Sequence, residues 1–87
     1  MFLRVRLRSD VDVRATIATN IRRYRRRGAL SQEALAHQIG KSERWLIEVE
    51  AGRVDIKLLD AIQLAEVLRI HLADLHRPAE TQQQTAR

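Results

Sequence analysis

The chain has 87 residues, which suffice for one small domain with a modest core and are too few for two. It holds no cysteine, which excludes disulfides and zinc–cysteine sites, and no apolar run long enough to cross a membrane. The net charge is +5, and residues 1–30 carry nine arginines against two acidic residues. A basic half is typical of a phosphate-binding surface, but it is equally consistent with a GC-rich coding sequence, because arginine far outnumbers lysine.

The first nine residues contain the stretch "LRVRL", in which apolar and basic side chains alternate. An extended chain places such apolar residues on one face, so the alternation predicts a short β-strand. A lone strand needs a partner, most naturally the same segment of a second copy in a dimer. Two other interpretations are a basic arm that reaches round DNA and a frayed terminus. Because the stretch lacks the continuous apolar run of a signal peptide, we expect a cytoplasmic protein.

Helical periodicity begins after this segment. Asp10 or Asp12 can cap a first helix that ends at Gly28. Its apolar positions are spaced four, four and three residues apart, which marks the buried face: Val13, Ile17, Ile21 and Tyr24. Its last turns hold five arginines, at positions 22, 23, 25, 26 and 27. Consecutive helical residues point around the axis, so these arginines cannot all face one ligand.

Two short helices follow, each with a serine cap and a glycine stop. Ser31 begins the helix "SQEALAHQI", which Gly40 ends. Ser42 begins the helix "ERWLIEVEA", which Gly52 ends.

The remainder of the chain predicts two more helices and a tail. Apolar residues recur at helical spacing over residues 56–68, and Leu72 and Leu75 indicate a short fifth helix. From Pro78 the tail "PAETQQQTAR" has no apolar period and is expected to be disordered. The predicted organisation is all-α, with an N-terminal arm or strand over 1–9, a helical domain over 10–76 and a disordered tail over 77–87.

The two serine-capped helices carry the spacing of a helix-turn-helix. With Gln32 as position one, the small Ala36 stands at five, Gly40 at nine, and the apolar Leu46 and Val49 at fifteen and eighteen. A small side chain lets the second helix cross close to the first, and glycine adopts the positive φ that a tight turn needs. Four matches at fixed offsets, with a cap on each helix, predict a helix-turn-helix.

Further segments extend this pattern: "SQEALA", "IGKS", "LIEVEAG" and "LAEVLRI", with an arginine near the end of the first helix. With them, residues 21–75 resemble the lambda-repressor-like family, also called the Cro/CI or Xre family. The resemblance implies a five-helix DNA-binding bundle. Three residues depart from the family's usual pattern: Lys41 replaces an apolar residue, Ala29 a frequent glycine, and His71 a Ser or Thr cap. We expect Gly28 to take over the turn role at Ala29.

The resemblance implies that the third helix enters the major groove while the second crosses the DNA backbone. By position it implies base-reading roles for Glu43, Arg44 and Glu48, with Trp45 beside them. Arg44 can bind guanine O6 and N7, and a glutamate can accept from cytosine N4 or instead hold Arg44 by an ion pair. Trp45 can touch a thymine methyl or the sugar–phosphate wall, or it can fold back over the second helix or a dimer partner.

Five residues around the same two helices are candidates for phosphate contacts: Gln32, Lys41, Ser42, Arg53 and Lys57. In the family the glutamine at the place of Gln32 also braces the reading helix. Arg25 and Glu50 match a family pair that forms a partly buried salt bridge between the first and third helices. These two residues are therefore assigned to structure, and Gly40 to the turn.

The predicted function is a sequence-specific DNA-binding transcriptional regulator, a repressor that acts as a homodimer on a palindromic operator in the nucleoid. The alternative is an antitoxin-like or other protein-interaction module on the same fold, with weak or no DNA binding, which the acidic residues of the third helix make credible. Catalysis is not expected, because His37, His71 and His76 lack metal-ligand spacing. We expect double-stranded DNA as partner and no cofactor, metal, membrane or small-molecule ligand.

Overall fold

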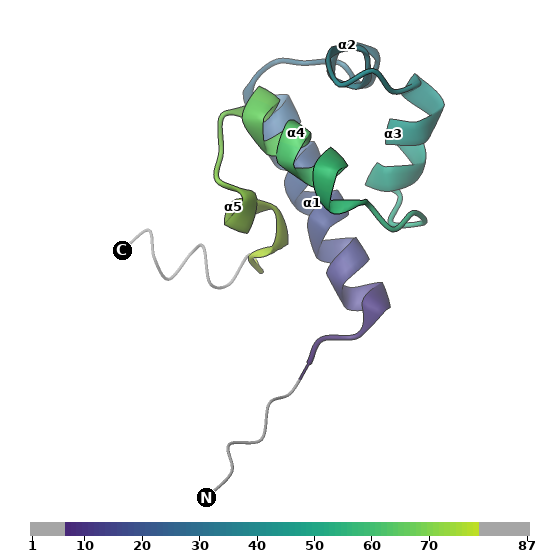
Figure 1. Cartoon of the computed structure of the whole chain (residues 1–87), viewed down its shortest axis with the longest axis vertical. Coiled ribbons are helices and arrows are strands. Elements are labelled where there is room, and N and C mark those ends of the chain that lie inside the picture. The colour runs from purple at the N-terminus through teal and green to yellow at the C-terminus, as the bar shows by residue number, and fades with distance from the viewer. Residues whose placement is uncertain (1–6, 79–87) are drawn as a thin grey trace, which may run out of the picture.

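The computed structural model describes residues 7–78, which form five helices and no strand (Figure 1). The helices are α1 (Asp10–Arg27), α2 (Gln32–Gln38), α3 (Glu43–Glu50), α4 (Leu58–Leu68) and α5 (Leu72–His76). The all-α bundle is as predicted, although α4 begins two residues later than the periodicity indicated. The strand predicted near residues 2–8 falls outside the described residues, apart from Leu7 and Arg8, which lie in no regular element.

The long helix α1 forms the spine of the domain. It packs against α3 and α5, and Figure 1 shows these two helices on opposite sides of it. Helix α2 joins α3 at the top of the same view, and α4 contacts α1, α2 and α5. Within residues 7–78, no helix combines the length and apolar character needed to span a membrane.

The centre of the core takes one large apolar side chain from each helix. Four of them are completely buried and the fifth, Leu75, is 1% exposed: Ile21, Leu35, Leu46, Leu64 and Leu75. Burying a side chain of this size stabilises a fold by roughly 1.5–3 kcal/mol relative to leaving it in water. Each helix therefore contributes one of its largest buried side chains to a single shared core.

Helix α1 ends at the predicted Gly28, which is its C-cap, but its N-cap and the turn that follows the helix differ from the sequence prediction. Ser9, rather than Asp10 or Asp12, is the N-cap, and its side chain accepts a hydrogen bond from the Asp12 amide. The two aspartates lie in the first turn instead, where their negative charge interacts favourably with the positive end of the helix dipole. At the other end Gly28 has φ −85°, and it is Ala29 that takes the left-handed conformation, with φ 57°. The expected turn role of Gly28 is therefore wrong.

The backbone explains why Ala29 is left-handed. The Leu30 amide donates to the Arg25 carbonyl and the Ala29 amide to the Arg26 carbonyl, at 3.0 Å each. These two bonds define a Schellman motif, in which the residue after the C-cap takes positive φ. Glycine is usual at that place because its missing Cβ removes the steric cost.

The turn between α2 and α3 has the same geometry with the expected residue. Gly40 has φ 71°, and the Lys41 amide reaches the Ala36 carbonyl at 2.9 Å. A Cβ built on Gly40 meets nothing within 4 Å, so the backbone conformation rather than lack of space requires glycine. Ala36 is fully buried, and Ser31 and Ser42 cap the two helices through their side chains, as predicted.

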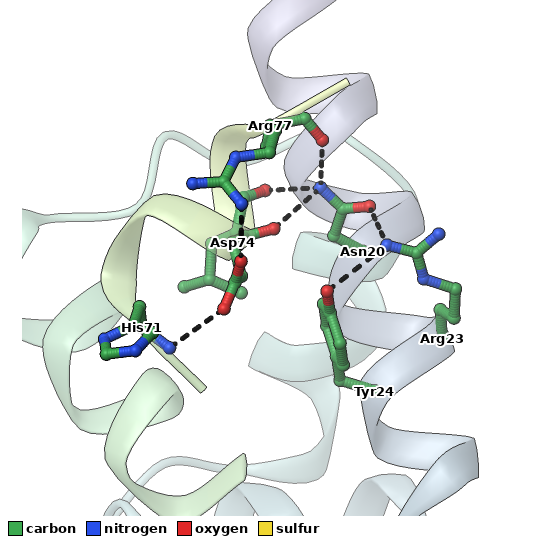
Figure 2. Close-up of polar contacts among 7 residues, drawn as sticks. Asn20, Arg23, Tyr24, His71, Asp74 and Arg77 are labelled. Atoms are coloured by element: carbon green, nitrogen blue, oxygen red, sulfur yellow. Dashed lines mark hydrogen bonds and ion pairs between the residues drawn. The ribbon is translucent and has the colours of Figure 1, made fainter. Parts of the chain in front are cut away.

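A buried amide ties α1 to α5 (Figure 2). Asn20 is 1% exposed, and its Nδ2 donates to the carbonyls of Asp74, Leu75 and Arg77 at 2.8–3.1 Å. The ordered body thus includes Arg77, which the predicted domain boundary leaves in the tail. His71 begins α5 with the help of Asp74, whose carboxylate accepts from the His71 amide at 3.0 Å. The weak cap expected of His71 is compensated by this bond.

Candidate nucleic-acid interface

Helix α3 has two faces of opposite character. Leu46 and Glu50 point into the molecule and are 0% and 3% exposed. Glu43 and Arg44 are exposed at its N-terminal end, and Ile47 is 39% exposed on its outer side. The outer side of α3 is therefore open to solvent, and two of the predicted base-reading residues stand at the end that enters the groove in helix-turn-helix proteins.

The inner end of α3 is held by a buried ion pair. Arg25 of α1 donates from Nε and Nη2 to the two carboxylate oxygens of Glu50, at 2.7 and 3.0 Å. This bidentate geometry is the strongest form of a carboxylate–arginine contact. Arg25 also donates to the Leu30 carbonyl at 2.9 Å, which fixes the loop before α2. The structure thus brings together the two residues that the sequence paired.

Two more side chains converge on Glu50. Gln32, the first residue of α2, donates from Nε2 to Glu50 Oε1 at 3.0 Å. Arg22 of α1 donates to the backbone carbonyl of Glu50, at the C-terminal end of α3. Its positive charge there interacts favourably with the negative end of the helix dipole. Helices α1 and α2 therefore fix the angle of α3 through a single residue.

The remaining phosphate candidates are not equally free. Ser42 is exposed, and its Oγ accepts from the Trp45 amide at 3.1 Å, which leaves its hydroxyl proton available to a phosphate. Arg53, a predicted phosphate contact, forms an ion pair at 2.9 Å with Glu48, a predicted base-reading residue. Neither side chain is therefore free to bind DNA while this pair is formed. Lys57 is exposed directly before α4.

Lys41 and Trp45 lie on the inner flank of the helix-turn-helix. Lys41 Nζ is 3.4 Å from Oδ1 of the buried Asp60 in α4, and it also lies 5.2 Å from the centroid of the Trp45 ring. Trp45 is half-buried and packs against the core. Trp45 therefore packs at least partly against the domain itself, which is the fold-back interpretation rather than a ring that stands free.

Most of the arginines of α1 are engaged inside the domain. Arg22 and Arg25 bind Glu50, whereas Arg23 and Arg27 each lie 5.0 Å from the centroid of the Tyr24 ring. Such cation–π contacts are worth roughly 0.5–1 kcal/mol at exposed sites. Part of the positive charge of α1 is therefore engaged in contacts within the domain, so the number of arginines does not by itself measure a phosphate-binding surface.

The sequence matches a known protein family. The HTH_3 helix-turn-helix family matches residues 21–75, the span from the last turns of α1 to α5. The chain belongs to this family. A curated relative of this HTH_3 protein is the uncharacterized HTH-type transcriptional regulator y4dJ of Sinorhizobium fredii, 29% identical over 70 residues, which are 80% of this chain and 91% of the relative.

Solved structures agree with the HTH_3 assignment. The hypothetical transcription factor NHTF from Neisseria superimposes with a TM-score of 0.82 at 30% identity, over 97% of both chains. The restriction-modification controller protein C.AhdI from Aeromonas hydrophila does so with a TM-score of 0.68 at 29% identity, over 71% of this chain and 94% of its own. Hydroxypropylphosphonic acid epoxidase from S. wedmorenis, at 21% identity and 37% of its chain, shares the fold alone.

Three residues that matter to this HTH_3 domain escaped the sequence analysis. Asn20 and Arg22 are polar residues of α1 that reach other helices, and Asp60 is buried at 8% exposure. Asn20 occupies position i+3 from Ile17, within the apolar stripe, and a polar residue in such a stripe is a signal of a buried hydrogen bond. Arg22 and Asp60 carry no comparable signal, because their partners come from distant parts of the chain.

Proposed function

We propose that this protein is a sequence-specific DNA-binding transcription regulator that inserts the N-terminal end of α3 into the major groove. The observation that carries the proposal is the contrast within α3, where Glu50 is locked by α1 and α2 while Glu43 and Arg44 remain exposed. A recognition helix needs this arrangement, since base contacts discriminate only when the helix is held rigidly. Membership of the HTH_3 family and similarity to transcription regulators support it.

The proposal gives each candidate site residue a role. Arg44 binds guanine O6 and N7 in bidentate fashion, and Glu43 accepts from cytosine N4. Ser42 binds a phosphate at the start of α3, and Gln32, which keeps one Nε2 proton on Glu50, offers its second to a phosphate at the start of α2, together with backbone amides. Lys57 is a further phosphate contact. When DNA is bound, Arg53 leaves Glu48 and binds a phosphate, and the carboxylate of Glu48 then contacts bases. Trp45 and Lys41 support the helix from the inner side.

The proposed working form is a dimer on an inverted repeat. Two α3 helices in successive major grooves lie roughly 34 Å apart, one turn of DNA, and the symmetry of the operator mirrors that of the protein. Binding at such a site blocks access to the DNA, so repression is the mode of action we propose, with the protein held on the chromosome in the cytoplasm.

A second candidate is a protein-interaction module that retains the fold with little DNA affinity. The exposed acidic residues Glu33 of α2 and Glu43 of α3 favour it, because like charges repel phosphates. Titration with random-sequence duplex DNA at two salt concentrations separates the candidates. Binding that weakens by orders of magnitude as salt rises supports the regulator. Absence of binding at low salt contradicts it and supports the interaction module.

Selection of bound duplexes from a random pool then tests sequence specificity. An enriched inverted repeat is expected, with half-sites about 10–10.5 base pairs apart from centre to centre. Enrichment of single, unpaired sites contradicts the dimer, and a pool that stays random contradicts sequence-specific reading.

A further inference from the structure

The two lysines of the chain stand in different surroundings. Lys57 is exposed directly before α4. Lys41, in the turn before α3, lies with its Nζ 3.4 Å from Oδ1 of Asp60, and the side chain of Asp60 is only 11% exposed. A carboxylate with so little water around it needs a paired charge, because burying an unpaired one is costly. Lys41 is therefore committed to Asp60, whereas Lys57 is available to a ligand.

Lys41 also reaches the first turn of α3. Its Nζ lies 5.2 Å from the centroid of the Trp45 ring, and Trp45 is the third residue of that helix. The Trp45 amide donates to Oγ of the N-cap Ser42 at 3.1 Å. A chain of contacts thus runs from α4 through Lys41 to the turn of α3 that carries Glu43 and Arg44.

The two ends of α3 are held by different groups. Its last residue, Glu50, is bound by Arg25 and Gln32. Arg44 lies six residues before Glu50, roughly 9 Å along the axis at about 1.5 Å per residue. Hydrogen bonds to a base edge weaken steeply when distance and angle are wrong, so a small tilt of α3 matters most at this far end. The end that reads bases therefore needs support of its own.

We infer that Asp60 is a positioning residue for the reading end of α3, acting through Lys41 and Trp45. This inference rests on the proposed function and places a determinant of sequence specificity outside the reading helix. Asp60 lies in the first turn of α4 and is 8% exposed, so it acts through its neighbours rather than on DNA. It fixes the ammonium group of Lys41, which in turn holds the Trp45 ring. Lys41 serves as a brace and not as a phosphate contact.

Salt dependence and sequence preference separate these two roles of Lys41. A phosphate contact strengthens binding to all sequences alike, and its loss lowers the slope of log affinity against log salt by about 0.9. A brace instead affects the preference for the selected operator over random-sequence duplex, and its loss leaves the slope unchanged. Lys57, which we assign to phosphate, provides the matched comparison within the same chain.

Lys41→Met removes the charge that pairs with Asp60 and keeps an unbranched side chain. The preference for the operator is expected to fall at least about fivefold, the lower end of what one bidentate base contact supplies, with the salt slope unchanged. Lys57→Met is the control, and it is expected to lower the slope with the preference unchanged. A slope in K41M reduced as much as in K57M, or an unchanged preference, overturns the inference.

A double-mutant cycle tests whether Asp60 and Lys41 act together. Asp60→Leu is expected to reduce the preference for the operator as Lys41→Met does. The double variant K41M/D60L is expected to restore most of it, because apolar side chains of similar volume can replace a buried ion pair. If the losses of the two single variants simply add in the double variant, the residues act independently and the inference fails.

Fluorescence supplies a readout that needs no DNA, because Trp45 is the only tryptophan in the sequence. Asp60→Leu is expected to increase quenching of the folded protein by acrylamide, since Lys41 no longer holds the ring, and K57M is expected to leave quenching unchanged. Unchanged quenching in D60L overturns the link from α4 to Trp45. If no duplex binds at all, the proposed function fails, and quenching still decides whether Asp60 positions the first turn of α3.

Discussion

Helix α1 holds two partners by buried polar contacts of different kinds. Toward α3 it uses a charged pair, in which Arg25 and Glu50 share two hydrogen bonds and Gln32 adds a third. Toward α5 it uses a neutral amide, in which Asn20 donates to three backbone carbonyls. The first contact fixes a helix whose outer side is exposed, and the second holds α5 against α1. If the proposed function holds, helix α1 supports the reading helix through the first contact and closes the fold through the second.

Glu50→Ala is expected to have the largest effect, because it leaves the buried Arg25 guanidinium without its partner. Loss of one member of a buried ion pair costs about 3–5 kcal/mol. Denaturant unfolding measures this loss, and DNA affinity is expected to fall as well, since α3 loses its support. Glu33→Ala removes an exposed carboxylate from α2 and serves as the control. A stability loss in E50A no larger than that in E33A contradicts a functional anchor at this site.

Asn20→Ala is expected to cost about 1–3 kcal/mol, because the carbonyls at the end of α5 lose their donor. A domain of this size then melts roughly 4–8 °C lower for each kcal/mol. DNA affinity per folded molecule, measured well below the melting temperature, is expected to stay unchanged. A drop in that affinity shows instead that the α5 anchor also shapes the reading surface, and the contrast between the two anchors fails.

Arg44→Ala tests the exposed side of α3, opposite the buried anchor at Glu50. Stability is expected to remain unchanged, because the side chain is exposed. Discrimination at one base pair is expected to fall by about 1–3 kcal/mol, the value of a good bidentate contact. Gln32→Ala, by contrast, is expected to weaken binding to all sequences alike. Binding assays with single-base operator variants distinguish the two patterns, and equal losses across all sequences in R44A contradict its base-reading role.

Ala29→Gly is expected to have the smallest effect and the opposite sign. The left-handed conformation at φ 57° costs an L-residue roughly 1–2 kcal/mol, and glycine removes that cost, less the extra chain entropy it brings to the unfolded state. A rise in melting temperature of a few degrees is therefore expected, with DNA binding unchanged. Gly28→Ala, at φ −85°, is the control and gains no such strain.

Local patterns account for the part of the structure that the sequence predicted. Serine caps, glycine stops and apolar periodicity lie within a few residues of each other, so Ser31, Gly40 and Ser42 could be assigned to their helix ends. The meeting of Arg25 with Glu50 came from family resemblance rather than from spacing. The N-cap Ser9 was missed because Ser9, Asp10 and Asp12 are all residue types that cap helices, and only the path of the incoming chain selects one of them.

Contacts between distant segments account for what could not be predicted. The burial of Asp60 and its link to Lys41 depend on how α4 crosses the helix-turn-helix. The same holds for Trp45, whose packing against the core depends on residues from other helices. In the candidate site, exposure of Glu43 and Arg44 followed from the motif, whereas the Arg53–Glu48 pair required coordinates.

The five central side chains of the core have a consequence for how the domain comes apart. Each helix contributes one of them to a single shared cluster, so the removal of any one helix uncovers apolar surface on its neighbours. Small domains with one shared core usually unfold in a single cooperative transition. Heating is therefore expected to unfold α3 and the helices that support it at the same temperature.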